Sequence, residues 1–468
     1  MRGLLVFLAF VASVPFVFVS PFNGILVWYA FSLGNFHRLV WGFFANIPYA
    51  FIIVIVTGLS WAISREKKQL PITPLVVLTL LFMVWITITS LFAAGPAASY
   101  AGYADAIWDK WTITEKKLLM CLVGFALTTT RERVNQLIWV VALSIGVWGL
   151  KGAIWSLLHG GAGRLYGPTG TAIGDNNDFG LALTVILPLL FYQWQRAVNP
   201  YLRRGLMVLG FLVAAAVVFT YSRGALVGLC AMGTVFWLRS RAKLATGALI
   251  LAVGVFAYSF APPQWFARMG TIETYQEDPS AMSRIHIWNI TLRIVEEHPI
   301  VGGGFMMTYF PVVVNPLLRG TGLAELRGPL AEHSIYFEVL AEHGWPGLML
   351  FLLVAAFSWR NCSWLVRRTR DRPELAWANL LGRMGQASLV AYWTAGAFVA
   401  QGYLDEYWCI IFIFDAARLL VTREIASPGS AFGAAGSTPL GVPQLGGASA
   451  ALVKSDATPA MPKAASKV

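Results

Sequence analysis

Charged residues are scarce in this chain of 468 residues. Only 12% of the residues are Asp, Glu, Lys or Arg, whereas soluble domains carry about a quarter. Apolar runs close to the roughly 20 residues that span a bilayer recur from the first residues to about residue 422. This composition excludes a soluble domain with a single anchor and predicts an all-α polytopic membrane protein.

Cysteine and nucleotide-binding motifs are equally sparse. The four cysteines, Cys121, Cys230, Cys362 and Cys409, are too scattered for a disulfide framework or a metal-ligand set. No Walker-type sequence occurs, and residues 302–304 are three glycines with no lysine after them. We therefore expect no cofactor, and a reaction that draws on an activated substrate rather than on ATP.

The formal net charge is +12, yet no basic face with interleaved aromatic residues occurs in a soluble segment. This pattern argues against a nucleic-acid partner. The basic residues instead occupy short loops between apolar runs, and such loops mark the cytoplasmic side of a bacterial inner membrane. The segments concerned are 65–68, 131–133, 196–204, 239–243 and 360–372.

Loop charge and run length together predict about twelve crossings, with both ends in the cytoplasm. The first run lacks a cleavage site and is expected to be a retained span. Counting residues 21–40 as a span would place residues 65–68 outside, so we expect a re-entrant or interfacial segment there. The expected spans are 2–20, 41–63, 71–93, 115–129, 135–158, 178–195, 205–221, 223–239, 243–261, 332–359, 383–401 and 404–422.

The domain prediction is one membrane domain, residues 1–425, followed by a disordered cytoplasmic tail at 426–468 that is rich in Ala, Gly, Ser and Pro. Residues 262–331 form the only long loop, and loops of this length commonly carry function. Apolar residues recur at helical spacing over 283–297 in this loop, so we expect a helix on the membrane surface or capping the bundle.

Arginines on the outer side run against the positive-inside bias. Arg223 sits at the lip of two apolar spans, where it needs an internal carboxylate or an anionic ligand. Its planar guanidinium suits phosphate. For Arg164 and for Arg284, position in the sequence favours ligand binding and lipid anchoring equally. The simpler role of headgroup anchor is favoured for Arg268, Arg319 and Arg327.

Histidine is scarce too, with six in the chain. His333 opens an apolar helix where the long loop ends, and an imidazole there can accept a hydroxyl proton. The alternative is a satisfied interfacial histidine. His343, inside the span pattern, is expected to be structural.

Acidic and polar residues supply weaker candidates. The stretch 174–178 is expected to cap the following span, with sugar contacts or a metal site as alternatives. Lys151, Asp405 and Glu406 lie in or at the outer parts of their spans and are expected to line the same cavity. Asp415 lies deeper and the sequence offers no role for it.

Several motifs in order resemble the O-antigen ligase and O-antigen polymerase superfamily. They are Ser222–Ala225, Ser283-Arg284 through Trp288, His298–Gly304, His333–Tyr336 and Leu340–Gly347. The N-terminal residues 21–38 resemble the subgroup of exosortase-associated O-glycosylation ligases. The family often has Asn after the histidine, and Ser334 stands there instead, so no role that needs an amide is carried over to this position.

The resemblance implies a GT-C-like fold and a metal-independent, inverting glycosyltransferase. It would move a glycan from undecaprenyl diphosphate to the lipid A–core oligosaccharide at the periplasmic face. By resemblance His333 activates the acceptor hydroxyl, while Arg223 and Arg284, with Arg164 as a helper, bind the diphosphate. Candidate glycan or acceptor contacts are Asp175, Asn176, Tyr336, Glu332 and Lys151.

Other functions remain open from the sequence. An O-antigen polymerase or a protein O-glycosylation ligase would use the same donor and the same motifs. A lipid-linked-sugar flippase is less favoured, because it should place charged residues deep within several spans around a water-filled cavity.

Overall fold

The computed structural model describes residues 2–40, 42–161, 163–239, 242–260, 263–270, 276 and 278–426. Its contacts divide the chain into two units, Met1–Arg423 and Glu424–Val468. Residues 427–468, most of the predicted tail, lie outside the described residues. The account below concerns the first unit.

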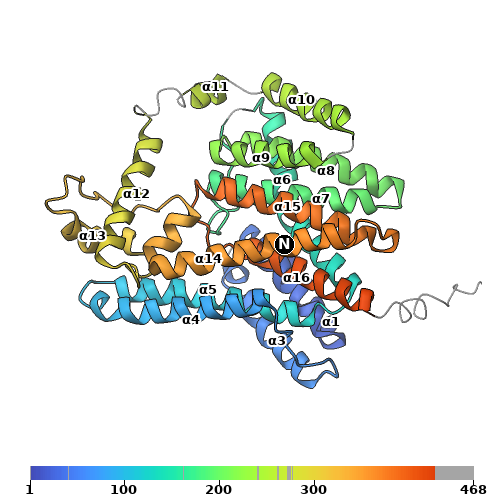
Figure 1. Cartoon of the computed structure of the whole chain (residues 1–468), viewed down its shortest axis with the longest axis horizontal. Coiled ribbons are helices and arrows are strands. Elements are labelled where there is room, and N and C mark those ends of the chain that lie inside the picture. Colours follow the sequence, from blue (N-terminus) through green and yellow to red (C-terminus); the bar gives the residue numbers. More distant parts are fainter. Residues whose placement is uncertain are drawn as a thin grey trace, which may run out of the picture. The chain divides into compact units, whose positions relative to one another are not determined.

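Helices are the regular structure of the described residues (Figure 1). The N-terminal part contains α1 (Arg2–Val19), α2 (Pro21–Gly34), α3 (Tyr49–Ile63), α4 (Pro74–Ala97), α5 (Tyr103–Leu127), α6 (Arg131–Leu158) and α7 (Asn176–Arg196). The remainder contains α8 (Pro200–Phe219), α9 (Arg223–Arg239), α10 (Lys243–Phe260), α11 (Pro263–Gly270), α12 (Pro279–Glu297), α13 (Pro311–Leu318), α14 (Ile335–Arg368), α15 (Ala376–Gly396) and α16 (Asp405–Ala426).

Four of these helices, α4, α6, α8 and α14, are long and apolar enough to cross a membrane by length and composition. Two shorter apolar helices cover residues 3–19 and 49–63. Large aliphatic and aromatic side chains on these helices are exposed, as suits a lipid-facing surface. The prediction of an all-α, multi-pass membrane protein is thereby confirmed in its coarse form, and the number of crossings stays a prediction.

The basic loops near residues 65–68, 131–133, 196–204 and 360–372 gather at one end of the bundle, which we name the basic end. Arg133 donates to both carboxylate oxygens of Glu66 at 2.7 Å, joining the α5–α6 and α3–α4 connections. Gln193 near the end of α7 donates to Asn135 at 3.1 Å. The guanidinium of Arg131 lies 5.1 Å from the Trp377 ring. The clustering predicted from loop charge is therefore a feature of the fold.

The remaining connections meet at the opposite end, which we name the His333 end. Asn176 at the start of α7 donates to the Thr220 carbonyl at 2.8 Å. Gln401 donates to the carbonyl of Ala172 at 2.7 Å. These contacts tie the α6–α7, α8–α9 and α15–α16 connections into one layer.

Residues 21–40 depart from the prediction. Ser20, between α1 and α2, donates to Glu66 at 2.9 Å and so lies at the basic end. At the other end of α2, Trp148 donates to the Gly34 carbonyl at 2.6 Å and Ser32 donates to Asp405. The helix therefore runs between the two ends, with most of its large side chains buried.

A re-entrant or interfacial segment on the outer face is thus wrong for residues 21–40. The hydrophobic pattern concealed this because α2 has only 14 residues and is enclosed by α1, α3, α5 and α6. A helix shielded by protein does not need the full length of a lipid-facing span. It follows that α1 begins at the His333 end of the bundle. The first and last residues of this unit therefore lie at opposite ends of the bundle.

Helix α5 begins at Tyr103, twelve residues before the predicted span at 115. Its first half carries Lys110, whose ammonium lies 2.9 Å from Glu338 and 2.7 Å from Glu342 on α14. Both carboxyl groups are buried. We name these three residues the Lys110 cluster. Gly402 donates to Glu338 at 2.8 Å, and Tyr403 and the Met306 amide donate to Glu342 at 2.9 and 3.1 Å.

The three glycines at 302–304 have a packing role. Helix α14 breaks at Gly344, whose φ of 66° falls in the left-handed region. Gly303 and Gly304 donate to the freed carbonyls of Ala341 and Glu342 at 2.7 and 3.1 Å. A side chain at Gly302 would meet backbone atoms of α14 at 2.7 Å. The glycines thus allow the long loop to pair with the broken turn of α14.

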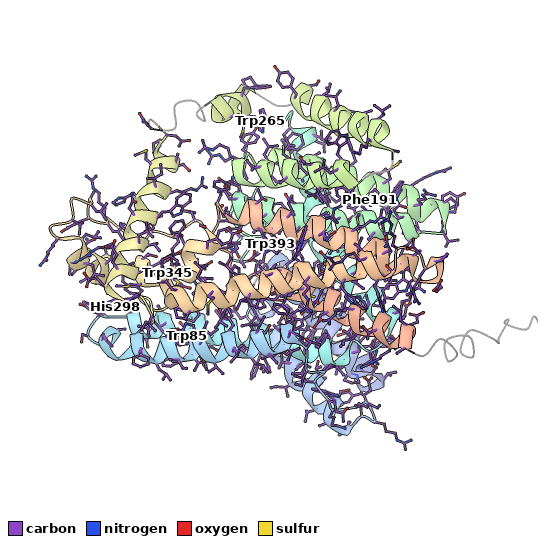
Figure 2. All side chains as sticks on the ribbon, viewed as in Figure 1. Trp85, Phe191, Trp265, His298, Trp345 and Trp393 are labelled. Atoms are coloured by element: carbon purple, nitrogen blue, oxygen red, sulfur yellow. The ribbon has the colours of Figure 1, made fainter. Side chains whose placement is uncertain are left out.

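Trp85 and Trp345 lie at this junction. Trp85 donates to the His343 carbonyl at 2.9 Å, and the Trp345 amide donates to Pro299 at 3.0 Å. Figure 2 shows both tryptophans with His298 in the same part of the bundle, where α4, α14 and the end of α12 approach each other. The motifs at 298–304 and 340–347 therefore form one structural unit.

Asp415 has a clear structural role. Thr73, the N-cap of α4, and Asn361 on α14 both donate to its carboxylate, the latter at 2.9 Å. Arg418 lies 3.6 Å away, one turn further along α16. The carboxylate thus joins α4, α14 and α16.

Replacing Lys110 with Met is expected to destabilise the protein by about 3–5 kcal/mol, the range for breaking a buried ion pair by removing one partner. The substitution leaves two buried carboxylates facing each other without a cation. Thermal unfolding of the detergent-solubilised protein would measure the loss.

Lys116→Met on the exposed surface of the same helix provides the control and should leave the melting temperature close to that of the wild type. Adding Glu338→Gln and Glu342→Gln to Lys110→Met should recover part of the stability. A Lys110→Met protein as stable as the control would contradict this role for the cluster.

Candidate functional site

His333 lies immediately before helix α14 in a strained conformation. Its φ is +50°, in the left-handed region that is uncommon outside glycine, although histidine is tolerated there more often than most residues. Ser334 is the N-cap and accepts a hydrogen bond from the Tyr336 amide at 3.3 Å. His333 was predicted to open the helix, but the helix begins two residues later, at Ile335. Non-glycine residues in this conformation cluster at functional sites.

The neighbours of His333 hold this backbone in place. Trp288 on α12 donates to the Glu332 carbonyl at 2.9 Å. Thr308 donates to the Glu332 side chain at 2.8 Å. Burial raises the pKa of the Glu332 carboxyl, with the negative charge of Glu342 adding to this effect and Lys110 opposing it. Glu332 therefore points into the protein core and holds the segment that carries His333.

The electrostatic surroundings favour a neutral His333 imidazole. Burial is the largest cause that lowers the pKa of His333, and the positive charge of Arg284 lowers it further. Asp175 acts in the opposite direction. Arg284 and Asp175 thus act electrostatically on His333, although the three residues come from α12, the N-cap of α7 and the segment before α14. A neutral imidazole near pH 7 can accept a proton.

Helix α12 presents Arg284 beside this histidine. The predicted helix at 283–297 is confirmed, but its buried face consists of Ile287, Ile290, Ile294 and Val295, whereas Ile285 and Leu292 are exposed. Trp288 stacks on Phe337 of α14, with the ring centroids 5.0 Å apart. Of the two predicted locations, capping of the bundle is the one observed.

Arg223 begins helix α9 and forms an ion pair. Its guanidinium lies 2.6 Å from the carboxylate of Asp278, which is 6% exposed. Asp278 is also the N-cap of α12, accepting from the Ser280 amide at 2.8 Å. The carboxylate thus links the N-termini of the helices that carry Arg223 and Arg284. Of the two partners expected for Arg223, an internal carboxylate is present.

Arg164 borders the same region. It is exposed, and its positive charge acts on Tyr221, two residues before Arg223. Tyr221 has a φ of +57° and donates to the Gly161 carbonyl at 2.6 Å. The two turns that carry Arg164 and Arg223 are therefore tied together.

The start of α7 supports the cap that was expected from residues 174–178. Asp175 is the N-cap and accepts from the Asn177 amide at 2.8 Å. Asn176 faces the turn before Arg223, as its bond to the Thr220 carbonyl shows. The cap fixes α7 beside His333 and leaves Asp175 exposed toward it.

Other candidate residues lie elsewhere. Lys151 is exposed on α6, 5.0 Å from the Trp148 ring, and no contact among the described residues joins it to His333. Tyr336 donates to the Trp393 carbonyl at 3.0 Å. Glu332 faces the core. Asp405 and Glu406 are buried and Ser32 donates to Asp405, and the shared cavity expected for Lys151, Asp405 and Glu406 stays a prediction.

His343 and the remaining outer arginines have simpler surroundings. His343 is fully buried, and its Nδ1 lies 2.7 Å from the Thr89 hydroxyl, in agreement with a structural role. Arg319 and Arg327 are exposed. The side chain of Arg268 lies outside the described residues.

Asp278 and the Lys110 cluster are the important residues that sequence reasoning missed. Asp278 precedes a proline and a helix start, which is a recognisable N-cap signal. Lys110 stands seven residues after the start of a helix whose apolar part begins later, so its positive charge resembled that of a loop residue. Neither pairing is visible from spacing along the chain.

The His333 end therefore combines a neutral imidazole with guanidinium groups carried by the N-termini of α9 and α12. We name His333, Arg223, Arg284 and Asp175 the His333 group. In the described residues no cluster of three or more His, Cys, Asp or Glu is placed to hold a metal ion. Such an arrangement can bind an anionic group and accept a proton nearby.

Two regions of the chain match known family models. Residues 206–352 match the family model described as O-Antigen ligase, and this range contains Arg223, Arg284 and His333. Residues 1–193 match a family of unknown function, DUF5935. No curated protein matches the chain. Residues 206–352 thus match the Wzy_C O-antigen ligase domain, and an N-terminal DUF5935 region precedes it.

Proposed function

We propose that this protein is an O-antigen ligase-type glycosyltransferase that moves a glycan from undecaprenyl diphosphate to the lipid A–core oligosaccharide. The reaction would be inverting and independent of metal, at the periplasmic face of the inner membrane. The observation that carries the proposal is the His333 group, where Arg284 and Asp175 from two other elements act on one strained histidine.

In this proposal the arginines bind the donor. Arg223 and Arg284 each offer a planar donor fork to diphosphate oxygens, and Arg164 contributes at the edge. Cationic groups that meet the diphosphate also stabilise the negative charge that grows as it leaves. The positive N-terminal ends of α9 and α12 add to the same field.

Asp278 then gives Arg223 a defined resting partner. A diphosphate would replace this carboxylate on the guanidinium, and the exchange keeps a charge-assisted bond in both states. Because Asp278 also caps α12, its release from Arg223 would affect the N-terminal part of the helix that carries Arg284, six residues further along.

His333 would accept the proton of the acceptor hydroxyl as that oxygen attacks the anomeric carbon. The bond to the diphosphate breaks as the new glycosidic bond forms, and the diphosphate departs as an anion without a general acid. Attack opposite the leaving group inverts the anomeric centre. A neutral imidazole is the form that can take up this proton.

The basic end faces the cytoplasm in our proposal, by the positive-inside rule, which puts the His333 end in the periplasm. Residues 1–425 form the transferase domain, and the segment 262–331 is its periplasmic loop. The opposite orientation would separate the site from a periplasmic glycan acceptor.

Two related activities would use the same donor. A protein O-glycosylation ligase differs in acceptor, and a polymerase joins one lipid-linked repeat to another. Deletion of the gene separates ligase from polymerase. Core-only lipopolysaccharide with intact lipid-linked polymer indicates the ligase, and single repeats on the core indicate the polymerase.

A flippase is the less favoured function. Buried ionisable residues do occur within the bundle, among them Asp405, Glu406 and Asp415, which the sequence places in spans, but most have internal partners. The Lys110 cluster forms ion pairs, and Asp405 and Asp415 accept hydrogen bonds. Glu406 is the exception, with neither oxygen hydrogen-bonded among the described residues.

Substitution of His333 or Arg223 by Ala is expected to abolish glycan transfer while leaving the protein folded and inserted. The purified protein would be supplied with undecaprenyl-diphosphate glycan and either lipid A–core or a candidate protein acceptor. Loss of a general base typically costs about 10²–10⁴-fold in rate.

His159→Ala and Arg319→Ala are the matched controls, since both residues are exposed and lie outside the His333 group. Chelators should leave wild-type transfer unchanged. Normal transfer by His333→Ala, or strict dependence on a divalent metal, would overturn the mechanism.

The pH dependence offers a separate check. Because the pKa of His333 is lowered, the histidine is neutral at pH 7, and kcat/KM should rise with pH only through an acidic limb below about 6.5, the ordinary pKa. Asp175→Asn removes a charge that raises this pKa, so the limb should move to lower pH. Asn remains a good N-cap, which limits damage to α7.

A pH profile of kcat/KM for the wild type and Asp175→Asn would measure the limb. A limb that stays in place, or moves to higher pH, would contradict the assignment of His333 as the titrating base.

A further inference from the structure

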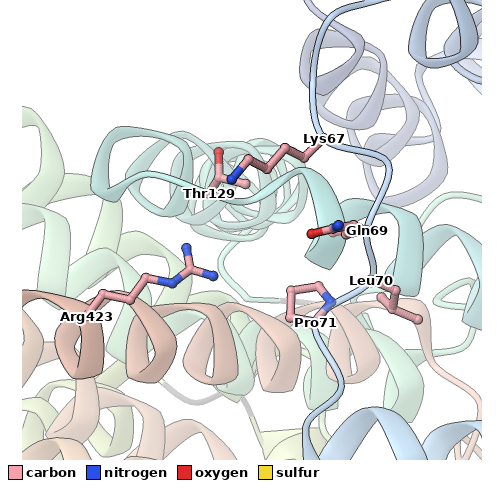
Figure 3. A pocket seen from close by; sticks show the side chains of 7 residues that line it. Lys67, Gln69, Leu70, Pro71, Thr129 and Arg423 are labelled. Carbon is pink, nitrogen blue, oxygen red and sulfur yellow. The ribbon is translucent and has the colours of Figure 1, made fainter. Parts of the chain in front are cut away.

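A second candidate site lies at the basic end, away from His333. A cavity of about 530 Å³ opens between the α3–α4 connection, the end of α5 and the C-terminal part of α16. Lys67, Gln69, Thr129 and Arg423 supply its polar lining (Figure 3). Figure 3 shows these four side chains reaching toward a common space from three separate segments. The proposed glycan transfer makes no use of this cavity.

The residues that line the cavity carry positive charges and no negative charge. Lys67 and Arg423 contribute two positive charges, and no Asp or Glu is among the residues that line it. Within the described part of the chain neither cation forms an ion pair. The adjacent acidic residue, Glu66, is turned toward Arg133.

Glu66 is held by hydrogen bonds to Arg133 and Ser20. Both of its oxygens accept hydrogen bonds from Arg133 at 2.7 Å, and Ser20 donates a third at 2.9 Å. Hydrogen bonding by Arg133 accordingly lowers the pKa of Glu66. The cavity therefore presents an ammonium, a guanidinium, a hydroxyl and an amide, a set of donors that suits a phosphate group.

The apolar lining and its surroundings identify the kind of phosphate. Leu70, Pro71 and Ala126 form the apolar part of the wall. Next to it, Ile63 at the end of α3 and Ile72 before α4 are 74% and 73% exposed. Aliphatic side chains beside a phosphate site would remain in water around a free ion, whereas the acyl chains of a lipid would cover them.

We propose that this cavity binds the phosphate of an anionic phospholipid, with the acyl chains lying along the aliphatic ends of α3 and α4. Basic pockets between membrane helices on the cytoplasmic side are recurrent sites for such headgroups. The lipid would bridge α16 and the α3–α4 connection, two segments that the cavity separates. This inference depends on the helices spanning a membrane and not on the transfer reaction.

Native mass spectrometry of the full chain, purified in detergent and titrated with phosphatidylglycerol or phosphatidylcholine, tests the proposal. Phosphatidylglycerol should be retained in preference to phosphatidylcholine. Each cation removed, in Lys67→Gln or Arg423→Gln, should weaken retention about five-fold, the factor for roughly 1 kcal/mol per basic residue near anionic lipid. The double variant should combine the two losses.

The matched control is Lys68→Gln with Arg370→Gln, which removes the same charge at the basic end but outside the cavity. It should retain phosphatidylglycerol like the wild type, and thermal unfolding should show all variants folded. Equal retention of the two lipids, or equal loss in the control, would overturn the site. Displacement of the lipid by excess inorganic phosphate would also overturn it, by assigning the cavity to free phosphate.

Discussion

The ion pairs between Lys110 and the two buried glutamates of α14 are the interaction on which the candidate site depends. Two carboxylates one helical turn apart repel each other unless a cation lies between them. Lys110 supplies it from α5, and Gly402 and Tyr403 add hydrogen bonds from the α15–α16 connection. The first turns of α14 are thereby fixed on both sides.

This fixed segment makes the strained histidine possible. A left-handed backbone at a non-glycine residue persists only when its surroundings determine it. Behind His333 lies the start of α14, held by Lys110; in front of it, Glu332 is held by Thr308 and Trp288. The break at Gly344 then lets the glycines of the long loop pair with α14. The motifs that are far apart in the sequence are thus parts of one support.

The two ends of the bundle differ in how their positive charges are paired. At the His333 end, Arg223 pairs with Asp278, while Arg284 and Asp175 act on the imidazole of His333. At the basic end, Arg133 neutralises Glu66 while Lys67 and Arg423 face a cavity without an acidic lining. Binding of a mobile donor suits the first arrangement, because a carboxylate can be exchanged for a diphosphate. Retention of a resident lipid suits the second.

Sequence patterns predicted the helical membrane class, the clustering of basic loops and the helix that carries Arg284, because each follows from local periodicity and charge. They could not predict α2, since a short helix enclosed by others has the composition of an interfacial segment. Lys110 was hidden for the opposite reason, as a charged residue normally argues against a span. The partner of Arg223 depends on which helix N-termini meet in space, and no spacing along the chain encodes that.

The central claim is a division of roles in which the arginines bind the diphosphate and His333 accepts the proton. Affinity for undecaprenyl diphosphate, measured alongside transfer for His333→Ala and Arg223→Gln, tests it most directly. His333→Ala should bind the diphosphate like the wild type and fail in transfer. Arg223→Gln should bind at least tenfold more weakly, as expected for losing charge-assisted hydrogen bonds worth about 1.5–3 kcal/mol each. Wild-type binding by Arg223→Gln, or wild-type transfer by His333→Ala, would contradict the account.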